Sequence, residues 1–428
     1  MKLRARTIRF ATLLAASLLA APVGVIAKAS PERTVSPRYD PAHRVFRLDA
    51  GDVTYAMGVN TDGILQTIYW GARLPADDPL GPAVPAPERS SFDPAGALTP
   101  QEYAGWGGAM TATPALKIRL DDGNRDVVLR YDSYRVDGEH LSILLRDAQA
   151  GVAVTLDYTA DAATGIIGRS AHIENAGKQA LTIDAAASAT WNLPRADDYS
   201  LRYLTGTWAG EWHLRTRAIT PGATVLESRR GSTGDENNPW FAIGRGGEWN
   251  EEHGDVWFGA LAWSGSWSIR VDEDILGQVR VVGGYNPFDF AYRLKPGEAL
   301  DTPVFYAGYT RDGIGEASRL LHRFERDRIL PGGARAALRP VLYNSWEATE
   351  FKVDEPGQER LAEKAAALGV ERFVVDDGWF GARDNDHAGL GDWVVNRRKF
   401  PNGLKPLIDK VHGLGMSFGL WVEPEMVN

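Results

Sequence analysis

Acidic side chains follow three short apolar runs in the C-terminal part of the sequence. They are Glu347, the consecutive pair Asp376 and Asp377, and the alternating Glu423 and Glu425. A carboxyl group that directly follows an apolar run is partly buried, so it needs a hydrogen-bonding partner or a ligand. Two carboxylates across a cleft, with aromatic surfaces beside them, are the arrangement that hydrolyses glycosidic bonds. The residues alone therefore favour glycoside hydrolysis, with one aspartate of the pair as a candidate nucleophile.

Each of these acids also has a structural alternative. Glu347 can pair with a neighbouring arginine, and Asp377 can cap the N-terminus of a helix through a side-chain oxygen. Because Glu423 and Glu425 alternate along the chain, at least one of them is expected to point away from a pocket. The sequence leaves these alternatives open.

A long segment without regular periodicity, residues 378–402, follows the aspartate pair. It exceeds the length of about 12–15 residues above which an irregular loop requires an explanation. The segment carries Trp379 and Trp393 together with Arg383 and several aspartates. Tryptophan is uncommon in solvated tails, so we expect an ordered wall of a binding site rather than a disordered insertion.

Other ligand classes find little support. The aspartates between residues 384 and 392 lack the spacing of an EF-hand calcium loop, and the eight histidines form no zinc motif. The glycines near residue 245 lack the lysine of a phosphate loop. We therefore expect no metal and no cofactor. Residues 1–29 hold five basic residues and no acidic one, so the remainder carries a net charge of about −14. That charge disfavours nucleic acid and anionic membranes as partners.

Alternating apolar residues dominate the chain from about residue 40 to residue 310. Examples are Val53, Tyr55, Met57 and Val59, and Val152, Val154, Leu156 and Tyr158. Asp122-Gly123 lies between two such runs and is typical of a β-hairpin turn. So many strands predict a large β-sandwich over residues 38–330. Near residue 314 the period becomes helical, and Pro331-Gly332-Gly333 ends that helix and places the domain boundary.

Strands and helices alternate after this boundary, over residues 338–428. Apolar runs at 341–343, 373–375 and 418–422 predict strands, and segments 357–368 and 404–414 predict helices closed by Gly369 and Gly415. This order implies parallel βαβ units with functional residues at the strand ends, as in a (β/α)₈ barrel. An open doubly wound sheet would carry a glycine-rich phosphate turn where this chain has Asn344-Ser345-Trp346-Glu347. We expect the first three units of a barrel.

The N-terminus has the features of an export signal. A basic head precedes an apolar run over residues 10–26, and Ala27-Lys28-Ala29 matches a signal-peptidase site. Pro22 and Gly24 interrupt the run, so a membrane-spanning helix fits less well. We expect residues 1–29 to be a signal peptide and the protein to be secreted or periplasmic. The chain has no cysteine, so no disulfide is expected.

Several strings of residues resemble family 36 of the glycoside hydrolases, the α-galactosidases of the melibiose and raffinose type. In the C-terminal part they are Tyr343-Asn344-Ser345-Trp346-Glu347-Ala348, Phe373-Val374-Val375-Asp376-Asp377-Gly378-Trp379-Phe380-Gly381, Leu390-Gly391-Asp392-Trp393 and Gly419-Leu420-Trp421-Val422-Glu423-Pro424-Glu425-Met426-Val427. In the β-rich part they are Gln101-Glu102-Tyr103, Glu227-Ser228-Arg229-Arg230-Gly231 and Asn286-Pro287-Phe288-Asp289-Phe290. The resemblance covers roughly residues 40 to 428 and keeps the order of the family's motifs.

The resemblance implies an N-terminal β-supersandwich, a central (β/α)₈ barrel and a C-terminal β domain. It also implies hydrolysis of terminal α-1,6-linked galactose with retention, without a cofactor, and often a homotetramer. Asp376 and Asp377 match the two aspartates that hold galactose hydroxyls, so neither is expected to be the nucleophile. Trp346 and Trp421 match aromatic residues of the pocket. No role follows for Trp379, Trp393, Glu423 or Glu425.

The resemblance further implies that the residues that break the bond lie outside this stretch. The family's nucleophilic aspartate follows the fourth barrel strand and its acid/base aspartate lies near the sixth. Both are therefore expected beyond Asn428, and the chain 1–428 is expected to be a partial sequence without hydrolase activity. Two alternatives stay open. One is a non-catalytic galactoside-binding protein, and the other is an α-N-acetylgalactosaminidase or a transglycosylase of the same superfamily.

Overall fold

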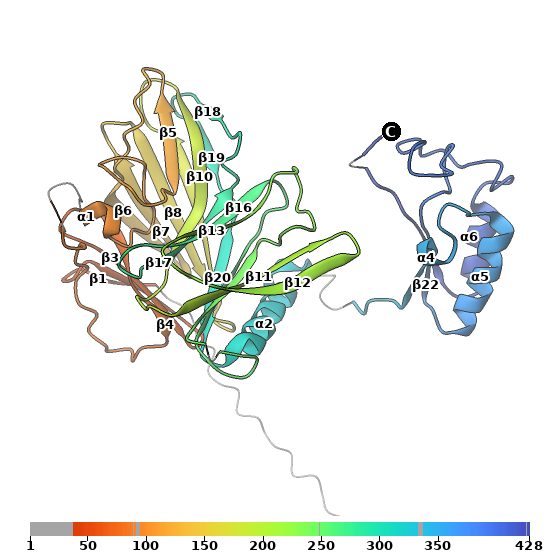
Figure 1. Ribbon diagram of the computed structural model, residues 1–428, viewed down its shortest axis with the longest axis horizontal. Helices are drawn as coiled ribbons and strands as arrows, with labels where there is room; N and C mark the ends of the chain where they lie inside the picture. Colours follow the sequence, from red (N-terminus) through yellow and green to blue (C-terminus); the bar gives the residue numbers. More distant parts are fainter. Residues whose placement is uncertain (1–36, 89, 91–94, 248, 333–336, 425) are drawn as a thin grey trace, which may run out of the picture. The chain divides into compact units, whose positions relative to one another are not determined.

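Two units make up the computed structural model, Met1–Ile329 and Leu330–Asn428 (Figure 1). The structure describes residues 37–88, 90, 95–247, 249–332, 337–424 and 426–428. The signal peptide predicted for residues 1–29 lies outside these residues. None of the helices among the described residues is both long and apolar enough to cross a membrane.

Within its described residues, the first unit folds into three antiparallel sheets. One sheet has the order β1 (Arg38–Asp40), β2 (Val45–Ala50), β3 (Val53–Val59) and β4 (Leu65–Ala72). A second has the order β13 (Gly222–Ser228), β16 (Trp267–Glu273), β17 (Val279–Tyr285), β10 (Leu181–Asn192) and β18 (Tyr292–Leu294), and β5 (Leu116–Leu120) also pairs with β10. The third has the order β12 (Gly210–Ala218), β11 (Tyr199–Thr207), β14 (Trp240–Arg245), β15 (Val256–Leu261), β20 (Phe305–Thr310), β9 (Ile167–Asn175), β8 (Val152–Ala160), β7 (His140–Asp147) and β6 (Arg130–Asp137), and β19 (Ala299–Asp301) also pairs with β9.

Helices are few in the first unit. They are α1 (Ala95–Leu98), α2 (Gly313–Phe324) and the short π-helical turn η1 (Glu325–Ile329). The helical period expected near residue 314 is confirmed by α2, which buries Ala317, Leu320 and Phe324 on one face. This face packs against β15 and β20, so the helix covers part of the large sheet (Figure 1). The unit is therefore almost entirely β-structure, as the alternating pattern indicated.

The turn at Asp122-Gly123 forms, but the hairpin predicted around it is wrong. Gly123 has a φ of +86° and donates its N–H to the Leu120 carbonyl. The flanking strands nevertheless belong to different sheets, because β5 pairs with β10 and β6 pairs with β7. The glycine sets the local direction of the chain, whereas burial of each strand against a distant partner decides the pairing.

A buried ion pair lies in the core of the first unit. Glu102 is fully buried, and Arg169 is 2% exposed, with 2.9 Å between the guanidinium and a carboxylate oxygen. Tyr55 and Tyr158 donate their hydroxyls to the same carboxylate. Burial opposes the charge of Arg169, but the Glu102 carboxylate outweighs it and raises the pKa of the guanidinium above its ordinary value. Because every partner is satisfied, the charges are tolerated in the core.

The second unit contains a parallel sheet of three strands among its described residues. Its order is β21 (Leu342–Asn344), β22 (Arg372–Val375) and β23 (Ser417–Leu420). The helices are α4 (Trp346–Thr349), α5 (Glu355–Ala367) and α6 (Lys405–Gly413). Helices α5 and α6 pack side by side and cover β22 and β23 (Figure 1). The parallel βαβ connectivity predicted from the sequence is confirmed.

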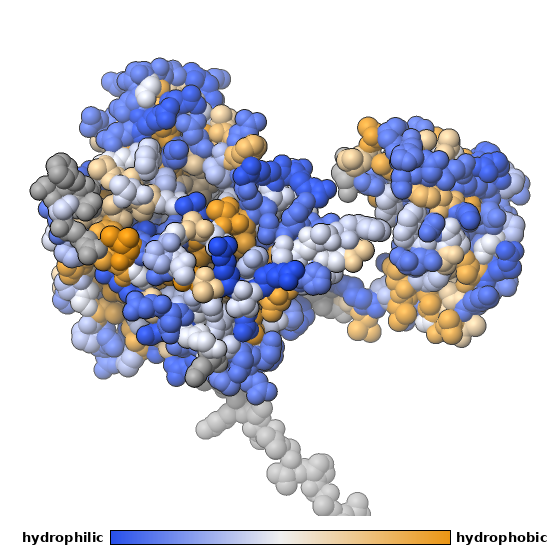
Figure 2. Space-filling view, in the orientation of Figure 1, coloured by the Kyte–Doolittle hydropathy of each residue, from blue (hydrophilic) through white to orange (hydrophobic). Residues whose placement is uncertain are grey.

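Local signals explain where these helices begin and end. The Asp354 side chain accepts a hydrogen bond from the Gly357 N–H and so caps α5 at its N-terminus. The chain leaves α5 through Gly369 and α6 through Gly415, both with positive φ, as the sequence predicted. Apolar side chains remain exposed in this unit, and Figure 2 shows apolar surface on its visible face. They include Val341, Leu342, Leu368, Val422, Met426 and Val427.

Candidate functional site

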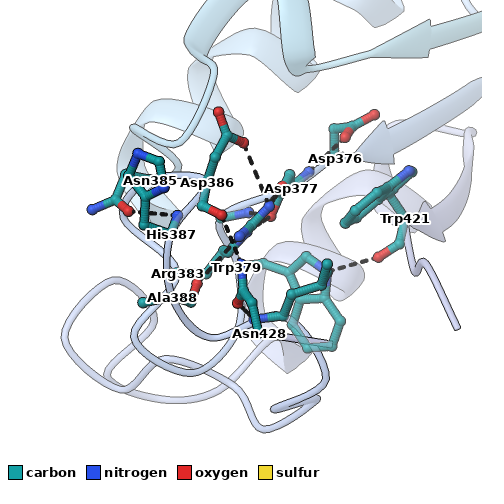
Figure 3. Close-up of polar contacts among 12 residues, drawn as sticks. Asp376, Asp377, Trp379, Arg383, Asn385, Asp386, His387, Ala388, Trp421 and Asn428 are labelled. Carbon is teal, nitrogen blue, oxygen red and sulfur yellow. Dashed lines mark hydrogen bonds and ion pairs between the residues drawn. The ribbon is translucent and has the colours of Figure 1, made fainter. Parts of the chain in front are cut away.

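The candidate site lies at the carboxyl ends of the three parallel strands. Parallel strands end at the same edge of a sheet, so residues that follow them in sequence become neighbours in space. The Ser345 N–H donates to the Val374 carbonyl, and the Trp421 N–H donates to the Val375 carbonyl, at 3.1 and 2.9 Å. These bonds fix the chain ends around Asp376, which directly follows β22. Figure 3 shows the aspartate pair with Trp421 and the following loop.

Asp376 is held from the neighbouring strand β21. It is 9% exposed, and its N–H donates to the hydroxyl of the buried Ser345 at 2.9 Å. One carboxylate oxygen accepts from the Asn344 side-chain amide at 2.5 Å, and the other accepts from the Asp377 N–H at 2.6 Å. A carboxylate can accept about four hydrogen bonds. Asp376 therefore keeps acceptor capacity for a ligand.

Asp377 forms a buried ion pair with Arg383. The Arg383 Nε lies 3.0 and 3.1 Å from the two carboxylate oxygens, and a terminal nitrogen lies 2.9 Å from one of them. The two side chains are 7% and 5% exposed. Hydrogen bonding to Asp377 raises the pKa of the Arg383 guanidinium above its ordinary value. The helix-cap alternative for Asp377 is wrong, because a turn follows it and its side chain binds the arginine.

The loop over residues 378–402 is ordered by its aromatic residues. Trp379 and Phe380 are buried, and the Trp379 Nε1 donates to the Trp421 carbonyl at 3.0 Å. The ring of Phe380 packs 4.5 Å from that of the partly buried Trp393. This confirms an ordered loop rather than a disordered insertion. Trp379 and Phe380 belong to the core of the second unit, so they support the loop from beneath.

The two tryptophans predicted to line a pocket keep part of their surface exposed. The ring of Trp346 packs edge-on against that of Phe351 at 5.1 Å, and the backbone N–H of Trp346 donates to the Asn344 side-chain oxygen at 2.8 Å. Trp421 follows β23 next to Asp376 (Figure 3) and packs near Phe380. Asn344 therefore links Trp346 to Asp376 through the two ends of one side-chain amide.

Of the three glutamates predicted near the site, Glu347 and Glu423 take no part in the contacts described above. Glu347 is exposed on α4 and forms no ion pair with a described residue, so the neighbouring-arginine alternative finds no partner in this part of the chain. Glu423 is partly buried after β23, and its charge contributes to the raised pKa of Arg383. Glu425 lies outside the described residues. Among those residues, no group of three or more acids and histidines lies close enough to hold a metal ion.

Sequence reasoning assigned no role to three residues that build this site. Asn344 belongs to one of the family-like strings, Arg383 lies in the irregular loop, and Lys399 follows two further basic residues, and none of these features indicates a specific role. Lys399 is 7% exposed at its side chain and binds backbone carbonyls, although it follows two exposed arginines. A basic run of this kind usually predicts a solvated surface. An irregular loop leaves backbone carbonyls without partners in a helix or sheet, and buried carbonyls need a donor. The length of this loop is therefore the signal that could have indicated a buried cation.

Comparison with known proteins shows the family to which the chain belongs. The Glycosyl hydrolase family 36 N-terminal domain matches residues 63–295, and the Melibiase domain matches residues 299–428. Alpha-galactosidase AgaA of Geobacillus stearothermophilus is 37% identical over 422 residues, which cover 92% of this chain and 57% of AgaA. Alpha-galactosidase Mel36A of Lactobacillus acidophilus is 32% identical, and the match covers 91% of this chain and 57% of Mel36A.

Solved structures agree with these matches. The crystal structure of the family 36 α-galactosidase AgaB of Geobacillus stearothermophilus superposes with a TM-score of 0.85 at 37% identity, over 92% of this chain and 57% of AgaB. A variant of AgaA in complex with raffinose superposes with a TM-score of 0.83 at 36% identity, over 90% of this chain and 57% of that one. The chain thus spans somewhat more than half the length of these relatives. Since the N-terminal domain pattern alone matches more than half of it, the chain belongs to glycosyl hydrolase family 36.

Proposed function

We propose that this chain supplies the galactose-recognising part of a retaining α-galactosidase that acts on terminal α-1,6-linked galactose. The observation that carries the proposal is the Asp376 carboxylate, held at the sheet edge with acceptor capacity left over and aromatic surface beside it. A charged acceptor on a sugar hydroxyl contributes roughly 1.5–3 kcal/mol, against about 1 kcal/mol for a neutral one. The raffinose complex of AgaA supports an oligosaccharide as the ligand class.

The same proposal assigns roles to the rest of the chain. The first unit is the β-supersandwich, and β21, β22 and β23 are the first strands of a (β/α)₈ barrel. Asp376 and Asp377 bind galactose hydroxyls, and Trp346 and Trp421 line the sugar pocket. The aspartates that break the glycosidic bond come from later barrel strands. We also propose export to the periplasm or the exterior through residues 1–29, and assembly into a homo-oligomer, with a tetramer as the first candidate.

Binding of galactose by purified 1–428 tests the recognition step. In calorimetric titrations we expect galactose to bind at least tenfold more tightly than glucose, because the two sugars differ only in the direction of the C4 hydroxyl. Equal affinity for the two sugars, or no heat from either, would count against the proposal.

The catalytic step is tested separately on the same protein. We expect 1–428 to release no phenol from an aryl α-galactoside, because the bond-breaking aspartates are assigned to later strands. Galactose binding without cleavage supports a recognition half-site. Measurable cleavage would show that the catalytic residues lie within this chain, and the assignment of Asp376 and Asp377 to binding would then be wrong.

Replacing Asn344 by Leu should weaken galactose binding about tenfold. The side-chain amide donates to Asp376 and accepts from the backbone N–H of Trp346, so its loss frees the carboxylate and the start of α4 together. A hydrogen bond to a charged group contributes about 1.5–3 kcal/mol, and 1.4 kcal/mol corresponds to a factor of ten. Calorimetry measures the effect. Asn385→Leu is the matched control, since Asn385 is exposed and caps only a local turn at His387. Equal affinities in the two variants would contradict a role for Asn344.

A further inference from the structure

Lys399 is buried in the loop that follows the aspartate pair, and its ammonium is surrounded by oxygens. The Nζ donates to the carbonyls of Phe351 and Gly378, each at 2.8 Å, and to the Arg383 carbonyl at 3.0 Å. A carboxylate oxygen of Asp384 lies at 2.8 Å. An ammonium has three protons, so the three carbonyls alone can satisfy it. A buried ammonium requires such a complete set of acceptors.

The three carbonyls belong to segments that together define the position of Asp377. Gly378 directly follows Asp377, and Arg383 is the residue whose guanidinium pairs with the Asp377 carboxylate. Phe351 follows α4, and the chain at Gly378 passes so close to it that a Cβ on Gly378 would lie 2.9 Å from the Phe351 carbonyl. The Lys399 ammonium therefore binds both the backbone of Gly378, which follows Asp377, and the backbone of Arg383, which pairs with the Asp377 carboxylate.

Asp384 completes the arrangement from the solvent side. It pairs with Lys399 and also with Arg398, and the hydrogen bond from Lys399 is the main cause of its lowered pKa. Asp384 is exposed, so the carbonyls rather than this carboxylate hold Lys399 in place. Without the ammonium, three carbonyls would lose their shared donor, and the loop would have no common anchor.

We infer that Lys399 is a positioning residue of the sugar site. Its ammonium fixes Gly378 and Arg383, and it thereby sets the position in which Asp377 presents its carboxylate to a galactoside. The inference deepens the proposed function and rests on it for the identity of the ligand. It predicts that the loop over residues 378–402 and galactose affinity respond together to changes at position 399.

The test compares Lys399→Met with Lys399→Arg in the chain 1–428. Lys405→Met is the matched control, because Lys405 is 80% exposed at its side chain and its ion pair in the described part of the chain is with the exposed Asp409. Amide hydrogen exchange of peptides covering residues 376–383 reports on the position of Asp377, and calorimetry with galactose reports on binding. We expect Lys399→Met to speed exchange at least tenfold and to weaken galactose binding at least tenfold. Lys399→Arg should recover a substantial part of both, and Lys405→Met should change neither.

Two results would overturn the inference. One is unchanged exchange of residues 376–383 in Lys399→Met, and the other is faster exchange with galactose affinity within twofold of the parent. If circular dichroism shows that Lys399→Met does not fold, Lys399→Arg decides the question. The inference then requires that galactose affinity and amide exchange of residues 376–383 either both change or both stay the same in Lys399→Arg. A change in one without the other overturns it. If the parent itself binds no galactose, the proposed function fails, and the exchange data alone decide whether Lys399 positions the Asp377 segment.

Discussion

Replacing Arg169 by Met should lower the free energy of unfolding of the first unit by about 3–5 kcal/mol, which is the cost of breaking a buried ion pair by removing one partner. The Glu102 carboxylate would remain fully buried without its counter-charge. Arg169 also donates to the Thr190 carbonyl, and it lies over the ring of Trp191 at 4.8 Å. Both contacts would be lost with the guanidinium. Urea denaturation followed by circular dichroism measures the change.

A second substitution separates the charge from the packing. In the double variant Arg169→Met with Glu102→Gln, the side-chain oxygen still accepts from the Tyr55 and Tyr158 hydroxyls, but no charge is left unpaired. We therefore expect the double variant to regain about 1–3 kcal/mol relative to Arg169→Met. Arg135→Met is the control, since this exposed pair with Asp137 contributes less than about 1 kcal/mol. A loss below about 1 kcal/mol in Arg169→Met would show that the pair is not a main source of stability.

The β-rich character of the first unit could be predicted, but the environment of its strands could not. Val53, Tyr55 and Met57 alternate with smaller residues, which suggests one buried face. In the structure every residue of β3 is buried, including Thr54 between them. Period two reports which side chains share a face of a sheet. It does not report whether the opposite face is covered, because that depends on segments far away in sequence.

Pairing between distant strands was also beyond the sequence. The turn at Gly123 follows from local backbone preferences and formed as predicted. The choice of β10 as the partner of β5 instead depends on burial over some sixty intervening residues, which no local pattern records. In the second unit each strand pairs in parallel with the next strand along the chain, so order along the chain and order in the sheet agree. There the positions of the strands and helices followed from periodicity and glycine caps.

In the candidate site, too, the features that depend on local sequence could be predicted, and those that depend on long-range packing could not. Asp376 and Asp377 could be identified because they directly follow a predicted strand, and parallel strands bring their ends together. Trp421 lies within a predicted strand, and only the family resemblance pointed to it. Arg383 and Lys399 were missed as functional residues because charged side chains in an irregular loop usually point to water. Their burial depends on how the loop folds back over Phe351, which is a long-range outcome. The acids could thus be identified from the sequence, but the cations that hold them could not.

Replacing Asp377 by Ala should destabilise the second unit by about 3–5 kcal/mol, in addition to its effect on sugar binding. The substitution removes the only carboxylate that Arg383 contacts at hydrogen-bonding distance among the described residues. Asp386, the next carboxylate, lies 3.6 Å away and is largely exposed. A guanidinium buried without a counter-charge is costly, so the loop must open to hydrate it. Urea denaturation and exchange of residues 378–402 measure this loss.

Asp376→Ala is expected to affect mainly galactose binding, whereas Asp377→Ala is expected to affect stability as well. Comparing the two variants therefore separates binding from folding. Among the described residues Asp376 has no buried counter-charge, and its carboxylate accepts there only from the Asn344 amide and the Asp377 N–H. Its removal should therefore cost about 1.5–3 kcal/mol of stability, which is the range for a hydrogen bond to a charged group and is smaller than the loss expected for Asp377→Ala. Galactose binding should nevertheless fall at least a hundredfold, because the Asp376 carboxylate keeps acceptor capacity for a sugar hydroxyl. If Asp377→Ala is as stable as Asp376→Ala, the Arg383 ion pair does not hold the loop, and Asp377 is a binding residue alone.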